Sequence, residues 1–267
     1  MGRVRGGALV ALLLVGGACS GGSGASPRDV LAAAPGKTLA EGTVRVAITA
    51  ELSGGSSGTA FNGEGEFDLE ARTGRLVLEG AGASEIRFVG EVVFVKLAQL
   101  QQRPWLRLDV EALSSRPGVD LDSLRQLQRN DPTAVLNYLS GVTDEVAEVG
   151  TETVRGDRTT RYRATLDLDK AQAESAPEVR EDIRRIVREL GTSVLPTEAW
   201  IDEEGRLRRL RYTLDLAELD TNGEAPASGK VTASFELYQF GRPVDVSAPP
   251  DAEVTDIEDL IDNPGAR

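Results

Sequence analysis

The sequence contains no histidine, and it has only one cysteine and one methionine among 267 residues. Without histidine, Ser-His-Asp catalysis, Cys-His catalysis and every histidine-ligated metal site are excluded. A single cysteine excludes disulfide bridges and thiolate metal clusters within one chain. Aromatic residues make up only 4% of the chain, so stacking platforms for sugars or nucleobases are few. Carboxylate-based chemistry, such as a glycosidase pair or an oxygen-ligated cation, is the class that these absences leave open.

Basic residues are fewer than acidic residues. The chain has 30 Lys and Arg against 43 Asp and Glu, which gives a formal net charge of −13. Binding to nucleic acid depends on neutralising its phosphates with basic residues, so we expect no nucleic-acid partner. The length accommodates one large domain or two small ones. No linker separates the two halves of the sequence, and this favours one domain.

The first residues have the pattern of a bacterial export signal. Two arginines precede an unbroken apolar run, residues 8–15, and the small residues 16–18 lie directly before Cys19. The apolar run is too short for a membrane-spanning helix. The single cysteine stands where a lipoprotein signal peptidase cuts, so the segment resembles a lipobox, although Gly16 occupies the position where leucine is usual. An ordinary secretory signal and a buried cysteine are the alternatives.

The expected processing divides the chain into three parts. Residues 1–18 are the signal peptide, residues 19–27 are the lipidated cysteine and a flexible tether, and residues 28–267 form a single domain. A diacylglycerol thioether and an N-acyl chain such as palmitate on Cys19 are together sufficient for stable membrane anchoring. The tether reaches only about 15 Å as a random coil. We therefore expect an extracytoplasmic protein held close to the cell membrane.

Alternation with period two, typical of half-buried strands, runs through most of the remaining sequence. In the first two such segments, residues 44–52 and 61–69, every second residue is apolar or glycine. Short strands joined by short turns favour antiparallel pairing. The further predicted strands are residues 75–79, 85–89, 92–97, 105–110, 146–153, 159–168, 197–201, 207–216 and 231–237.

Three segments carry helical signals. Residues 121–129 are weakly periodic, and residues 131–141 begin with an Asp-Pro pair suited to an N-cap and the first helical position. Residues 179–190 place five aliphatic side chains on one stripe and are followed by Gly191, a typical helix stop. The order of strands and helices predicts an α+β fold, a large antiparallel sheet with helices on one face.

Several segments, taken in their order, point to a known family. They are the lipobox, the helix that begins at Asp131-Pro132, the run at 92–97 followed by Trp-Leu-Arg-Leu, and the ending at 235–250. In this order they resemble the LppX/LprG-type lipoproteins of mycobacteria and their actinobacterial relatives. The family supplies no catalytic residue, and Cys19 is the residue matched one to one.

The resemblance implies both a fold and a function. The fold is that of LolA and LolB, an unclosed, curved antiparallel half-barrel with helices packed on its concave face. The function is to bind an acylated lipid or glycolipid in an apolar cavity between sheet and helices and to carry it in the cell envelope. The alternative is an envelope sensor or scaffold of the same fold that binds a protein partner.

The inward faces of the predicted strands are mainly aliphatic, and an aliphatic lining suits acyl chains. The same faces can instead pack against the helices as an ordinary core, and the sequence leaves both interpretations open. Gly63 and Gly65, on one such face, either leave room for a ligand or allow the sheet to coil sharply. The candidate residues lining a lipid cavity are Val46, Ile48, Phe61, Phe67, Leu69 and Phe88.

The pattern of the charged clusters is typical of a solvent-exposed surface and not of a binding or catalytic site. Arginines at 206–211 and 180–188 are suited to lipid phosphates, but their acidic neighbours favour a solvated, ion-paired face. The alternating carboxylates at 64–70 and 167–169 have the pattern of outward strand faces, and nothing marks one as a buried general acid. No phosphate loop, calcium loop or nucleophile elbow is present in the sequence. We therefore expect no enzyme, no metal site and no cofactor.

Overall fold

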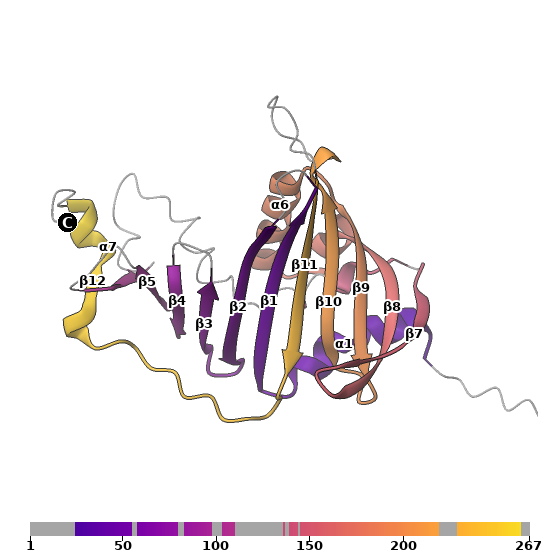
Figure 1. Ribbon diagram of the computed structural model, residues 1–267, viewed down its shortest axis with the longest axis horizontal. Helices are drawn as coiled ribbons and strands as arrows, with labels where there is room; N and C mark the ends of the chain where they lie inside the picture. Colours follow the sequence, from indigo (N-terminus) through magenta and orange to yellow (C-terminus); the bar gives the residue numbers. More distant parts are fainter. Residues whose placement is uncertain are drawn as a thin grey trace, which may run out of the picture.

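One open sheet organises the molecule. The computed structural model describes residues 25–54, 58–79, 83–97, 103–109, 136, 139–143, 145–218 and 229–262. Within these residues, twelve strands form one sheet in the order β12-β6-β5-β4-β3-β2-β1-β11-β10-β9-β8-β7 (Figure 1). The edge strands β12 and β7 do not pair with each other in this part of the chain. The expected α+β architecture, a large unclosed half-barrel, is confirmed.

The predicted strands all appear, with boundaries shifted by a few residues. The strands are β1 (Thr43–Ser53), β2 (Gly58–Asp68), β3 (Thr73–Glu79), β4 (Ala83–Val89), β5 (Val92–Leu97), β6 (Trp105–Asp109), β7 (Ala147–Val154), β8 (Asp157–Asp167), β9 (Val194–Asp202), β10 (Leu207–Asp215), β11 (Lys230–Tyr238) and β12 (Val254–Asp256). The α-helices with described bounds are α1 (Pro27–Leu39), α5 (Leu168–Glu174), α6 (Pro177–Leu190) and α7 (Ile257–Asp262).

The sheet is antiparallel except at one edge. β12 pairs with β6 in parallel, so the sheet is mixed there and not antiparallel throughout. After β11, which lies inside the sheet, the chain runs along the lower rim in Figure 1 to the edge formed by β6 and β12. A long connection of this kind can deliver a strand in either direction, whereas the tight hairpins elsewhere require antiparallel neighbours.

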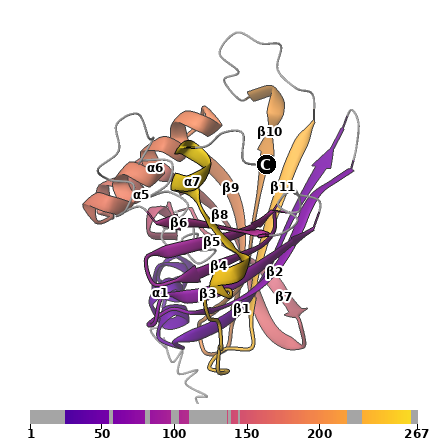
Figure 2. The same cartoon turned by 90° about the vertical axis from the view of Figure 1, so that its left-hand side faces the viewer.

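The helices α1, α5 and α6 lie on the same side of the sheet (Figure 2). α1 contacts β9 and β10, while α5 contacts β8 and α6. Leu31 of α1, Leu168 of α5 and Ile183 of α6 are each fully buried in the core cluster. Among the described residues, α1 and α5 therefore pack against the β8–β10 part of the sheet.

One of the three predicted helices is confirmed, and the other two lie wholly or mostly outside the described residues. α6 begins at Pro177, ends at Leu190 and is followed by Gly191 with a φ of 64°, as the sequence predicts. The predicted helix at 121–129 lies outside the described residues, as does most of the one at 131–141. The sequence interpretation missed α1 and α5, and Pro27, assigned to the tether, is the first residue of α1.

Gly65 illustrates how closely two strands approach on the inner face. It lies opposite Val46 on β1 and Leu76 on β3. A Cβ atom at this position would collide with the carbonyl oxygen of Arg75 and lie 3.0 Å from Cε2 of Phe67. At Gly63 a Cβ would lie 2.9 Å from Cδ2 of Leu78. Neighbours fill the space at both glycines, so tight packing explains them better than room for a ligand.

Replacing Gly65 with Ala should therefore destabilise the protein by about 2 kcal/mol, because the backbone of β3 has to move away. Gly36 in α1 is a matched control, since a Cβ there has no heavy atom within 4 Å. The same change at Gly36 should stabilise the protein by about 0.5–1 kcal/mol. Denaturant unfolding of both variants measures the two effects. A Gly65→Ala protein that is as stable as the wild type, or more stable, would contradict the close approach at Gly65.

Candidate functional site

The inner face of the sheet carries one apolar row that is buried along its whole length. Cross-strand partners define this row over six neighbouring strands, and each of its members is buried. The rings of Phe67 and Phe88 approach with their centroids 5.8 Å apart, on either side of Gly74. The members are Val44, Phe67, Gly74, Phe88, Val93 and Leu108.

The neighbouring row is buried at one end and accessible at the other. Val46 and Leu76 are buried, but their partners further along the row, Ile86, Val95 and Leu106, are partly exposed. On β3, the inward side chain of Leu78 is partly exposed as well. We call Leu78, Ile86, Val95 and Leu106 the open aliphatic row. Its side chains contact the core cluster and also reach solvent.

The proposed cavity residues divide between these environments. Val46, Ile48, Phe67 and Phe88 are core residues, each 7% exposed or less. Leu69 is partly buried and packs against the core from the end of β2. Phe61 lies in β2 opposite Ala50, but its side chain is outside the described ones, and so is Cys19. The sequence analysis did not identify the open aliphatic row as a candidate lipid contact, although the period-two pattern placed its members in predicted strands.

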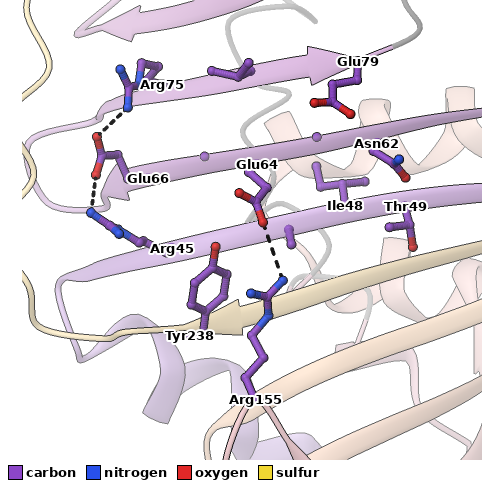
Figure 3. A pocket seen from close by; sticks show the side chains of 14 residues that line it. Arg45, Ile48, Thr49, Asn62, Glu64, Glu66, Arg75, Glu79, Arg155 and Tyr238 are labelled. Carbon is purple, nitrogen blue, oxygen red and sulfur yellow. Dashed lines mark hydrogen bonds and ion pairs between the residues drawn. The ribbon is translucent and has the colours of Figure 1, made fainter.

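The outer face of the sheet carries a polar groove of about 660 Å³ (Figure 3). Cross-strand pairing on β1, β2 and β3 arranges much of its lining in three successive rows. In the first row the carboxylate of Glu66 forms ion pairs with two arginines, whose nearest guanidinium nitrogens lie 3.3 and 3.4 Å from its oxygens. The second has small and apolar side chains flanking a glutamate, and the third is uncharged except for one glutamate. The rows are Arg45–Glu66–Arg75, Ala47–Glu64–Val77 and Thr49–Asn62–Glu79.

Arg155, at the turn between β7 and β8, closes one side of the groove (Figure 3). Its Nε donates a hydrogen bond to Glu236 at 2.6 Å, and its guanidinium group lies 4.0 Å above the ring of Tyr238. Another nitrogen lies 3.8 Å from Glu64 on β2. One side chain from the far part of the sheet thus contacts both β11 and β2.

Glu236 makes the stability of this region depend on pH. Burial raises the pKa of its carboxyl. The hydrogen bonds from Arg155 and Arg209 together lower this pKa by more than burial raises it, so the pKa lies below its ordinary 4.5. Because the pKa is lower in the folded state, these ion pairs stabilise the fold above pH 4.5, and the contribution is lost as the pH falls through the folded-state pKa. We expect Glu236→Gln to lose about 1–2 kcal/mol at pH 7. Its free energy of unfolding should then decline less steeply than that of the wild type between pH 5 and 3, as measured by urea titration at each pH.

The arginine clusters are engaged with acidic partners and aromatic rings. Arg206 donates to Asp202 at 2.8 Å and to Glu41 at 3.1 Å. Arg211 lies 5.2 Å above the ring of Trp200. On α6, Arg184 pairs with Glu181. The α6 cluster is therefore an exposed, ion-paired surface, as expected. On β10 the expectation is wrong for Arg208, which is 4% exposed and pairs with Asp157 and Asp202.

Carboxylates that alternate along the strands also have local structural partners. Asp68 accepts hydrogen bonds from the backbone nitrogens of Glu70 and Ala71, and Asp167 caps the N-terminus of α5. Among the described residues, no group of three or more His, Cys, Asp or Glu side chains is arranged to hold a metal ion. The helices in this part of the chain include none that is long and apolar enough to cross a membrane.

Comparisons with known proteins add to this description. No protein-family profile matches the chain, and no curated protein matches its sequence. Similar solved structures include the lipoprotein LppX of Mycobacterium tuberculosis, with 20% identity, a TM-score of 0.46, and coverage of 81% of this chain and 98% of LppX. LprF from Mycobacterium bovis has 15% identity and a TM-score of 0.47 over 84% of this chain and 96% of LprF.

A LolA superfamily protein from Nitrosomonas europaea is also similar. It has 10% identity and a TM-score of 0.30, and the alignment covers 82% of this chain and 94% of that protein. At these identities the similarity concerns the fold alone.

Proposed function

We propose that this protein is an extracytoplasmic lipoprotein of the LppX/LprG type, anchored to the cell membrane through Cys19. In this proposal it binds an acylated lipid or glycolipid between the sheet and the helices and carries it in the cell envelope. The lipobox and the ordered sequence segments support the anchor and the type. The open aliphatic row supports the ligand class, and it is the observation that carries the proposal.

The two inner-face rows have different roles in this proposal. The fully buried row stabilises the fold, since it includes two aromatic rings and is covered along its whole length. The open aliphatic row presents side chains from four adjacent strands, β3 to β6, on the side of the sheet that faces the helices. Single exposed apolar residues are ordinary, but a contiguous row on a concave face is typical of a binding surface.

Burial of methylene groups provides the driving force for binding. Each CH₂ group transferred from water to an apolar surface contributes about 0.8 kcal/mol. Aliphatic side chains without hydrogen-bonding groups suit an acyl chain and offer nothing to a polar substrate. Binding and release of such a ligand require no bond to be made or broken, so the proposed role is that of a carrier and not of an enzyme.

Mass spectrometry of organic extracts tests this function. A soluble form, residues 20–267, lacks the signal and Cys19 but retains every described residue, and it is purified from a lipid-rich host. We expect about one acyl lipid per protein. Purified protein that is folded but contains no lipid would contradict the carrier role and favour a sensor or scaffold, for which capture of membrane partners is the next experiment.

A further inference from the structure

The outer groove contains polar groups that the fold leaves unused. Among the residues that the structure describes, no hydrogen bond or ion pair engages the side chains of Thr49, Asn62 or Glu79 or the hydroxyl of Tyr238. Glu64 has one contact of 3.8 Å, and its side chain is 70% exposed. Donors and acceptors therefore line the same groove and face solvent (Figure 3). The sheet lies between these groups and the open aliphatic row, although Ile48, a core residue of β1, also lines the groove.

The charge distribution argues against an ionic ligand. Three arginines and three glutamates line the groove, and they alternate across the strands. A small anion would lie near the carboxylates, and a cation would lie near the guanidinium groups, so neither gains a net attraction. Nucleic acid is disfavoured by the same carboxylates and by the net charge of the chain.

A peptide is also a poor match for this groove. Peptide recognition depends on a few side chains anchored in well-packed, desolvated pockets. The outward apolar side chains of this groove are Ala47 and Val77, and Val77 is 40% exposed. This floor is shallow and offers no pocket for a large anchor. It does provide a small apolar patch between hydrogen-bonding groups.

We infer that the outer groove binds a neutral saccharide, such as a segment of a linear glycan. Sugar hydroxyls donate and accept hydrogen bonds, so they can use Asn62, Glu64, Glu79 and Thr49 together. Ring C–H groups fit the patch formed by Ala47 and Val77. The volume of about 660 Å³ lies within the range of ligand-binding sites.

The scarcity of aromatic residues sets the expected strength of binding. Tyr238 is the one aromatic residue among the described residues that line the groove, and the guanidinium group of Arg155 already lies on its ring. Recognition therefore depends on hydrogen bonds made in competition with water, and each contributes little net free energy. We expect a dissociation constant on the order of 1 mM.

Saturation-transfer NMR and calorimetry test the inference on the full-length protein in a detergent that has no sugar head group. The probes are maltohexaose, mannohexaose and arabinohexaose, with a Lys-Thr-Val-Thr-Glu peptide and inorganic phosphate in separate titrations. We expect at least one hexasaccharide to bind. Glu79→Ala should weaken it about tenfold, because a charged hydrogen-bond partner is lost. Val77→Asp should also weaken it, because a solvated carboxylate replaces the apolar surface against which the ring C–H groups pack.

Glu203→Ala is the matched control, because it removes an exposed carboxylate in the β9–β10 turn, away from the groove. This variant should bind the saccharide as the wild type does. Three results overturn the inference. They are no binding of any hexasaccharide up to about 20 mM, binding that neither Glu79→Ala nor Val77→Asp weakens, and binding of the peptide or phosphate in place of the saccharides. Since no lipid is measured, failure here leaves the carrier proposal unaffected.

Discussion

Replacing Ile86 with Trp is expected to remove the bound lipid from the protein without unfolding it. Ile86 lies in the open aliphatic row between Leu76 and Val95, and it is partly exposed. The indole ring would occupy space that an acyl chain contacts, and the partial exposure limits the cost of overpacking to about 1 kcal/mol. Displacing about four methylene groups costs about 3 kcal/mol and weakens binding by more than a hundredfold. Mass spectrometry of organic extracts should therefore recover less than about one tenth of the wild-type lipid.

Val77→Trp is the matched control for this experiment. Val77 lies on β3, one strand away, but it faces the outer groove. The same indole on that face should leave lipid content unchanged. Thermal unfolding of both variants shows whether each retains its fold. Full lipid content in a folded Ile86→Trp protein would show that the bound lipid does not contact the open aliphatic row at Ile86.

The strands could be predicted because their signal is local. On β1, Val44, Val46, Ile48 and Ala50 alternate with more polar residues, and the structure buries all four on the same face. Short turns such as Arg155-Gly156 then fix antiparallel neighbours. The order of strands in most of the sheet follows from these hairpins. The α+β class follows from the amphipathic stripe of α6, whose Ile183 is fully buried.

The parts that sequence analysis missed depend on signals that are weak or distant. α1 begins with a capping box in which Ser26 and Asp29 bond each other's backbone, but its sequence contains Gly36 and Pro35 and lacks a strong apolar stripe. α5 has only seven residues and continues directly from β8. The pairing of β12 with β6 joins residues about 150 positions apart, and no local pattern specifies such a partner.

Sequence analysis could predict which face of the sheet carries the candidate site, but not how deeply each of its residues is buried. Period-two alternation correctly places Val46, Phe67 and Phe88 on the inner side of the sheet. An inward residue can be buried or accessible to solvent, depending on its position along the strand. Phe88 is buried, whereas Ile86, on the same strand and face, is partly exposed. The outer groove was equally inaccessible to sequence analysis, because Arg155 reaches it from a hairpin several strands away.

Phe67 provides the sharpest distinction between a core residue and a ligand contact. The sequence allows either role, but the structure shows a side chain that is 3% exposed. Its ring covers Gly74 so closely that a Cβ on the glycine would collide with it. An aromatic ring packed over a strand glycine, with Phe88 beside it, compensates for the missing side chain.

Replacing Phe67 with Ala should therefore destabilise the protein by about 3–5 kcal/mol, because a cavity opens over Gly74 and next to Phe88. The midpoint of thermal unfolding should fall by about 10 °C or more. Phe67→Leu is the milder control, with an expected loss of about 1–2 kcal/mol, since most of the apolar volume is retained. Calorimetry of the lipid-free proteins measures these losses without a contribution from ligand binding. A loss below about 1 kcal/mol for Phe67→Ala, together with loss of bound lipid, would instead place Phe67 at the ligand and extend the lipid site into the buried row.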